Sequence, residues 1–130
     1  MTKKSIIISG RVINGNKYGR QLGFPTANID RRQYAREKLR VKLGVWAGRA
    51  EFKIFNLKIK NYRAAIVIGP MDKTGLPKLE AHLLNFKGNL YGRKISIYLD
   101  KYIRPFKKFK SEAELKKQIG ADLKIINTIL

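Results

Sequence analysis

One stretch decides how this chain is interpreted: Gly19-Arg20-Gln21-Leu22-Gly23-Phe24-Pro25-Thr26-Ala27-Asn28. Pro25 fixes its own backbone φ angle and disfavours helical geometry at Phe24, so the chain after Pro25 is expected to be extended. Residues two apart in an extended chain point to the same side, so Thr26 and Asn28 project together. Their hydroxyl and amide oxygens suit Mg²⁺, which needs few protein ligands where phosphate oxygens and waters complete its shell.

The residues upstream of Pro25 favour contact with a polyphosphate. Gly10, Gly15 and Gly19 allow the backbone to approach phosphates closely, and Lys17 and Arg20 supply positive charge. The alternative is an ordinary junction between a loop and a strand, where Thr and Asn make local hydrogen bonds. Spacing alone favours that alternative, and the choice between the two depends on the sequence downstream.

The composition describes a globular chain. Its 130 residues suffice for one domain with one core, and 44% hydrophobic residues exclude a disordered chain. The absence of cysteine from the sequence excludes disulfides, zinc-thiolate sites and cysteine nucleophiles, and suits a reducing cytosol. The apolar run Ile6-Ile7-Ile8 is too short for a signal peptide or a membrane span. We therefore expect a cytoplasmic, monomeric, single-domain protein without a membrane partner.

The charge of the chain is strongly basic. Lys and Arg number 29 against 9 Asp and Glu, a formal net charge of +20, which attracts polyanions. Residues 30–42 are the obvious candidate for a polyanion-binding surface. The four aromatic residues Tyr34, Trp46, Tyr62 and Tyr91 extend this to a second hypothesis, a basic β-barrel that binds nucleic acid. A solvated, lysine-rich surface explains the charge equally well, because the basic residues are spread along the chain.

Six short segments separated by turn signals predict an antiparallel barrel or sandwich. They are Ser5–Val12, Thr26–Ile29, Gly44–Phe52, Tyr62–Ile68, Lys78–Phe86 and Leu90–Leu99. Lys87-Gly88-Asn89 predicts a hairpin between the last two segments, and Asn61 a turn before the fourth. Gly69–Pro77, with two prolines and two glycines, predicts a loop without regular structure.

The C-terminal segment Ser111–Leu130 predicts one amphipathic helix packed on the barrel. Ser111-Glu112-Ala113-Glu114 is a capping box. Apolar residues then recur at helical spacing: Leu115, Ile119, Leu123, Ile126 and Leu130. Gly120 weakens this helix by about 1 kcal/mol relative to alanine.

The candidate for acid–base chemistry lies in the fifth segment. The sequence contains no phosphate-binding glycine loop of the standard nucleotide-binding folds, and its only histidine is His82. Glu80 and His82 lie two apart in an apolar strand and share a face with Leu84 and Phe86. A solvent-exposed face explains the two polar residues but not the two apolar ones. An apolar neighbourhood raises the pKa of a carboxylic acid, which suits a general base.

Taken together and in order, these motifs closely resemble the riboflavin kinase (flavokinase) family over nearly the whole chain. The matching strings are Gly10-x-Val12-x-x-Gly15, Gly19–Asn28, Gly44-Val45-Trp46-Ala47, Leu79–Phe86, Leu90-Tyr91-Gly92, Ile103-Arg104-Pro105 and Lys108-Phe109-Lys110-Ser111. The resemblance implies a six-stranded antiparallel Greek-key barrel with a C-terminal α-helix. It also implies transfer of the γ-phosphate of ATP to the ribityl 5′-hydroxyl of riboflavin, giving FMN and ADP.

The resemblance also assigns roles to residues at matching positions. It implies that Thr26 and Asn28 bind the metal and the phosphates, that Glu80 takes the hydroxyl proton, and that Arg104 helps to hold the flavin. The metal would be Mg²⁺ or another divalent cation such as Zn²⁺ or Mn²⁺. Because 130 residues leave no room for an FMN adenylyltransferase domain, the chain resembles the stand-alone kinases.

A glycine-rich flap over the nucleotide is the last implied feature. It would contain Gly15, Gly19 and Arg20, and Asn16-Lys17-Tyr18 makes it shorter than is common in the family. Phe106 stands where an acidic residue usually follows Arg-Pro, a departure on the flavin side of the site.

Overall fold

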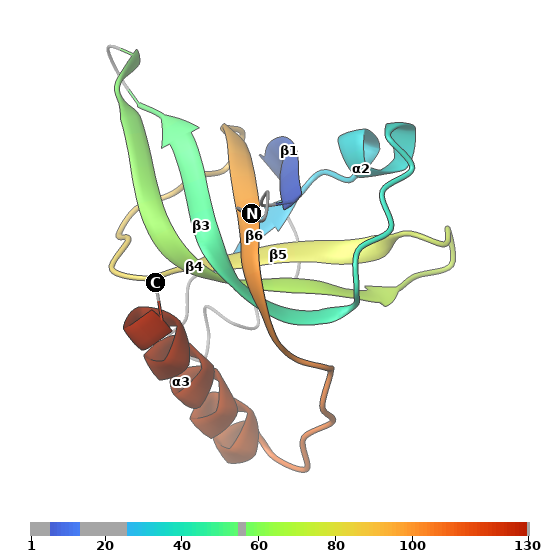
Figure 1. Cartoon of the computed structure of the whole chain (residues 1–130), viewed down its shortest axis with the longest axis vertical. Helices are drawn as coiled ribbons and strands as arrows, with labels where there is room; N and C mark the ends of the chain where they lie inside the picture. The colour runs from blue at the N-terminus through green and yellow to red at the C-terminus, as the bar shows by residue number, and fades with distance from the viewer. Residues whose placement is uncertain (1–5, 14–25, 55–56, 130) are drawn as a thin grey trace, which may run out of the picture.

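Six antiparallel strands close into a barrel, and a helix lies against its outer wall (Figure 1). The computed structural model describes residues 6–13, 26–54 and 57–129. The strands are β1 (Ile6–Ile13), β2 (Ala27–Ile29), β3 (Gly44–Lys53), β4 (Ile59–Met71), β5 (Pro77–Leu83) and β6 (Lys94–Arg104). The helices are the short α2 (Arg32–Arg36) and the long α3 (Glu112–Ile129).

The order of the strands around the barrel is β1-β2-β5-β4-β3-β6. Strands β3, β4 and β5 pair consecutively, and β6 returns to lie beside β3, which is the Greek-key arrangement. Strand β1 closes the barrel between β6 and β2. The prediction of a six-stranded antiparallel barrel with a C-terminal helix is confirmed.

The prediction of a hairpin at Lys87-Gly88-Asn89 is wrong. Strand β5 ends at Leu83, and β6 begins only at Lys94. Both edges of β5 are already paired, with β2 and β4, so no edge remains for the next strand. Strand β6 instead pairs with β1 and β3, which makes residues 84–93 a connection across the end of the barrel.

Two predicted breaks lie inside β4. Asn61 is not a turn but pairs with Glu51 of β3, and β4 continues through Pro70 to Met71. A register shift interrupts the pairing with β5 between Ile68 and Met71, so Pro70 lies at an irregularity where a missing N–H is tolerated. The loop predicted over Gly69–Pro77 is thereby reduced to a short turn after Met71.

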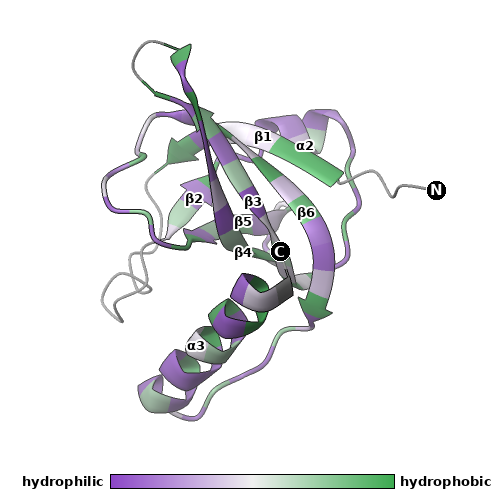
Figure 2. Ribbon diagram, turned by 60° about the vertical axis from the view of Figure 1, so that its left-hand side comes forward, coloured by the Kyte–Doolittle hydropathy of each residue, from purple (hydrophilic) through white to green (hydrophobic). Residues whose placement is uncertain are grey.

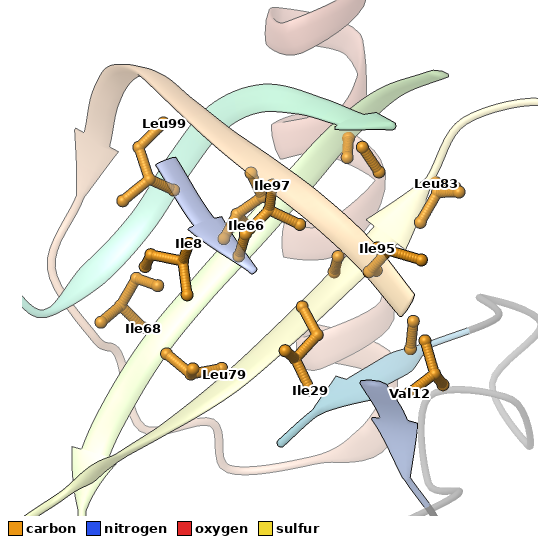
Figure 3. Packing of buried hydrophobic residues seen from close by; sticks show 14 of the residues in the cluster. Ile8, Val12, Ile29, Ile66, Ile68, Leu79, Leu83, Ile95, Ile97 and Leu99 are labelled. Atoms are coloured by element: carbon orange, nitrogen blue, oxygen red, sulfur yellow. The ribbon is translucent and has the colours of Figure 1, made fainter. Parts of the chain in front are cut away.

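The core fills the inside of the barrel with aliphatic side chains (Figure 3). Ile8, Ile66, Ile68, Ile95 and Ile97 have at most 1% of their surface exposed and converge there from β1, β4 and β6. Because side chains alternate between the two faces of a strand, the residues between these isoleucines point outward. The barrel interior is therefore a packed core, and any ligand site must lie on the outer wall or at an end.

Helix α3 begins and packs as the sequence predicts. The Ser111 hydroxyl accepts a hydrogen bond from the Glu114 N–H at 3.2 Å, while the Glu114 carboxylate accepts one from the Lys110 N–H at 3.0 Å. Hydrophobic and hydrophilic residues are both present along α3 (Figure 2). Its fully buried Ile126 packs against Ala47 and Ala65 on the outer wall of β3 and β4. Within the described part of the chain, neither helix has the length and apolar character that crossing a membrane requires.

Candidate active site

A cavity of about 280 Å³ lies outside the barrel wall and next to α3. Strands β3, β4 and β5 form its floor, and α3 and the segment before it supply further walls. Its lining residues are Thr26, Val45, Ala65, Val67, Gly69, Pro70, Lys78, Glu80, His82, Arg104, Phe106, Lys107, Phe109, Leu115, Ile119 and Asp122. Apolar side chains predominate, and a few polar groups converge among them, as is typical of small-molecule sites.

One row of directly paired residues crosses five strands on this wall. The row is Arg104 on β6, Val45 on β3, Val67 on β4, Glu80 on β5 and Asn28 on β2. Residues directly opposite one another in antiparallel strands project to the same face. Glu80 therefore lies between the apolar residues Val45 and Val67 on one side and the polar side chain of Asn28 on the other.

The local pattern of β2 turns its polar residues toward Glu80. Ala27 and Ile29 are buried in the barrel core, so Thr26 and Asn28 face outward. The hydroxyl oxygen of Thr26 lies 3.1 Å from Nδ1 of His82, which is the nearest outward-facing residue after Glu80 on β5.

Burial in the apolar wall raises the pKa of the Glu80 carboxyl above its ordinary value. The nearby positive charge of Lys78 opposes this shift and lowers the pKa in part. Desolvation is the larger of the two causes, because Glu80 faces Val67 across the sheet. A carboxylate of this kind is a stronger base than one in water, and it is the form that accepts a proton.

At the other end of the row, Arg104 is held by Asp122 of α3. The Nη2 and Nε atoms of Arg104 donate to the two carboxylate oxygens of Asp122 at 2.7 and 3.0 Å. Asp122 is 4% exposed, and Gln118 donates to the same carboxylate at 3.0 Å. This paired, hydrogen-bonded arrangement is what allows a charged group to be buried.

Comparison with known proteins decides the family. A family model described as riboflavin kinase (flavokinase) matches residues 2–130. The chain belongs to the riboflavin kinase family.

Three relatives illustrate this family membership. A bifunctional riboflavin kinase/FMN adenylyltransferase of Buchnera aphidicola is 42% identical over 123 residues, which cover 92% of this chain and 37% of that protein. An RNA-binding riboflavin kinase of Bacillus subtilis is 34% identical over 122 residues, which cover 92% of this chain and 49% of that protein. The crystal structure of riboflavin kinase from Trypanosoma brucei superposes with a TM-score of 0.72 and 25% identity, covering 100% of this chain and 82% of that one.

The structure brings several of the predicted riboflavin kinase residues together. Thr26, Glu80 and Arg104 line the same cavity, and Asn28 is the direct neighbour of Glu80 across the sheet. The predicted flap residues are Gly15, Gly19 and Arg20, and they lie outside the described residues. The roles of all these residues in the reaction remain predictions.

The sequence interpretation overlooked Asp122. Asp122 follows Ile119 by three residues and precedes Ile126 by four, so it lies in the apolar stripe of α3. A charged residue in an apolar stripe is buried only when it is paired, so the position of Asp122 in the sequence could have predicted a basic partner such as Arg104.

The oxygen atoms near Glu80 fit a divalent cation bound mainly by phosphates. Among residues 6–13, 26–54 and 57–129, no three His, Cys, Asp or Glu side chains form a metal-binding group. Thr26 and Asn28 instead offer neutral oxygens beside one carboxylate, which suits Mg²⁺ when substrate phosphates supply further ligands.

Proposed function

We propose that this riboflavin kinase family member transfers the γ-phosphate of ATP to the 5′-hydroxyl of riboflavin, giving FMN and ADP, with residues 1–130 as one kinase domain. The observation that carries the proposal is the position of Glu80. This carboxylate has a raised pKa and lies between the apolar wall at Val67 and the polar side chain of Asn28. A base is needed where an apolar ring substrate and a triphosphate meet.

The chemical step asks little of the protein beyond positioning, charge neutralisation and one base. The carboxylate of Glu80 takes the proton of the 5′-hydroxyl as the oxygen attacks the γ-phosphorus. A new oxygen–phosphorus bond forms, and the bond from the γ-phosphorus to the bridging oxygen breaks. ADP leaves with the electron pair of that bond, and the proton passes from Glu80 to water after FMN departs.

The two halves of the row suit the two substrates. Val45 and Val67 offer an apolar floor for the flavin ring, and Phe106 and Phe109 supply aromatic rings at the cavity edge. Thr26 and Asn28 stand at the opposite end, where they would bind a divalent cation, Mg²⁺ in our proposal, and the phosphates. Such a cation supplies neutralisation of charge on the triphosphate.

The test is formation of FMN by the purified protein. The protein is incubated with riboflavin, each nucleoside triphosphate in turn and Mg²⁺, Mn²⁺ or Zn²⁺, and products are separated by chromatography. We expect FMN and ADP in equal amounts from ATP with Mg²⁺. Absence of FMN under every combination, while the protein stays folded, would contradict the proposal.

The net charge favours a second candidate function, nucleic-acid binding. A charge of +20 attracts polyanions, and the Bacillus subtilis relative is named as RNA-binding. Three of the four aromatic residues expected to stack on bases are packed instead: Tyr34 is 3% exposed, Trp46 contacts Tyr102 edge-on, and Tyr62 stacks on Phe52. Tyr91 is 58% exposed. Among these four residues, only Tyr91 therefore offers a largely exposed ring for base stacking, so we favour the kinase.

A further inference from the structure

The ion pair between Arg104 and Asp122 joins the barrel to α3 at the edge of the cavity. Arg104 comes from the last residue of β6, and Asp122 lies eighteen positions later on the helix. Both residues line the cavity, at the end of the row opposite Asn28. The catalytic step proposed above uses neither of them.

The hydrogen bonds of Arg104 leave part of its guanidinium group available to a ligand. A guanidinium group carries five N–H donors. Two of them go to the Asp122 carboxylate, and Nη1 donates a third to the Pro105 carbonyl at 3.1 Å. Two N–H donors therefore remain, in an orientation that the bidentate pair with Asp122 fixes.

The pair also compensates the charge of Arg104 itself. The carboxylate of Asp122 is 4% exposed and is held further by Gln118, so it stays beside the guanidinium. An arginine compensated in this way still donates hydrogen bonds, but it attracts an anion much less than a lone arginine does. Such a group suits the neutral carbonyl oxygens of a ring better than a phosphate.

We propose that Asp122 is a positioning and specificity-determining residue: it orients and neutralises Arg104, so that Arg104 donates to an uncharged, carbonyl-bearing ring in preference to an anion. The proposal rests on the proposed function, because it takes the ring to be that of riboflavin. It assigns the specificity for the ring to an acidic residue of α3 that does not itself act in phosphoryl transfer.

The test compares the wild-type protein with Asp122→Asn, which keeps the shape and removes the charge. Binding of lumiflavin, a neutral flavin ring without the ribityl chain, is followed by fluorescence. We expect Asp122→Asn to weaken lumiflavin binding about tenfold, the usual worth of one well-made hydrogen bond. Inorganic phosphate should compete with lumiflavin in this variant and not in the wild type. The KM for riboflavin should rise by a similar factor, with kcat changed by less than about twofold.

Three further variants separate this role from a merely structural one. Glu112→Gln removes an exposed acidic charge from the same helix and should bind lumiflavin as the wild type does. Gln118→Ala removes one hydrogen bond to the Asp122 carboxylate but keeps the ion pair, so it should weaken lumiflavin binding less than Asp122→Asn does. It replaces Asp122→Asn as the test variant if that protein does not fold. In an Arg104→Ala background, Asp122→Asn should have no further effect on lumiflavin binding.

The outcomes distinguish this inference from the proposed function. If the wild type binds lumiflavin and folded Asp122→Asn binds it equally well, without competition by phosphate, Asp122 only anchors α3 and the inference is overturned. Should the wild type bind neither riboflavin nor lumiflavin, the proposed function itself fails, and the inference fails with it.

Discussion

Glu80 shows how a side chain acquires its chemistry from where the sheet places it. The residue alternates with Leu79 and Ala81, which point into the core, so its carboxyl must face the outer wall. The wall at that point is apolar, because Val67 lies directly opposite. Desolvation then raises the pKa of the Glu80 carboxyl, as the apolar residues around it in the sequence predict.

Replacing Glu80 by glutamine should lower kcat by about 10²–10⁴, the usual contribution of one acid–base group. The amide keeps the size of the side chain but cannot take the hydroxyl proton. The measurement is the steady-state rate of FMN formation at saturating riboflavin and ATP. Glu51→Gln, on the outer face of β3 and away from the cavity, is the matched control and should retain the wild-type rate. Full activity in Glu80→Gln would remove Glu80 from the role of base.

The same substitution should stabilise the protein at neutral and higher pH. Burial raises the pKa of Glu80 in the folded chain, so the folded state binds its proton more tightly than the unfolded state does. Ionised Glu80 therefore costs stability once the pH exceeds the folded pKa, and the cost vanishes below the unfolded pKa of about 4.3.

Thermal denaturation at several pH values measures this effect. We expect Glu80→Gln to raise the Tm at about pH 8 and to lose that advantage at about pH 3, where both states of the wild type are protonated. A variant less stable than the wild type at the higher pH would mean that the ionised carboxylate has a compensating partner.

At the scale of the elements, β3 approaches β6 closely at Gly48. A Cβ atom there would lie 1.9 Å from the Tyr98 carbonyl oxygen and 2.7 Å from Cδ1 of Ile66. The contact lies beside a register shift between the two strands, where the backbones come together. Only glycine fits, and the neighbouring atom is backbone, which cannot swing away.

Two alanine substitutions should therefore act in opposite directions. Gly48→Ala must push β3 from β6 and should cost about 3 kcal/mol or more of unfolding free energy, as an overpacked core site does. Gly120→Ala, in α3 with open space around its added methyl group, should stabilise by up to about 1 kcal/mol. Urea unfolding followed by circular dichroism gives both values. Equal effects of the two substitutions would contradict this account of the β3–β6 contact.

At the scale of the whole molecule, the acidic residues are few and several are already paired. Asp30, Asp72, Asp100 and Asp122 each form a salt bridge with an arginine. The hydrogen bonds from Thr74 and Arg31 hold the pKa of the Asp72 carboxyl well below its usual value, so Asp72 stays ionised near neutral pH. Even so, basic residues exceed acidic ones by twenty, and the surface as a whole remains cationic.

This charge predicts weak, salt-sensitive binding to any polyanion. Single-stranded oligonucleotides of different sequence should bind equally, with a Kd on the order of 10⁻⁴–10⁻⁶ M at physiological salt, and the logarithm of affinity should fall linearly with that of salt concentration. Fluorescence anisotropy with labelled oligonucleotides, titrated at several salt concentrations, measures both. Binding that depends on sequence or survives high salt would favour the nucleic-acid-binding hypothesis instead.

The parts of the fold that the sequence predicted well depend on local or periodic signals. The capping box at Ser111 and the apolar spacing after it marked α3, and the alternation around Ile66 and Ile95 marked buried strands. The prediction of a hairpin after Phe86 was wrong because strand pairing is not a local property. Strand β5 already pairs with β4 on one edge and, on the other, with β2 from near the beginning of the chain. The turn predicted at Asn61 was wrong because Asn61 lies within a long strand and pairs in register with Glu51, although asparagine favours turns.

The sequence by itself predicted outward-facing oxygens at Thr26 and Asn28 and a carboxylate at Glu80, because strand alternation and the spacing around Pro25 are short-range properties. Arg104, the last residue of β6, was predicted only from the resemblance to the riboflavin kinase family. Only the tertiary structure decided that these residues form one row across five strands and that Asp122 reaches back from α3 to hold Arg104. Closure of the barrel and docking of the helix bring together segments distant in sequence, and no local pattern carries their register.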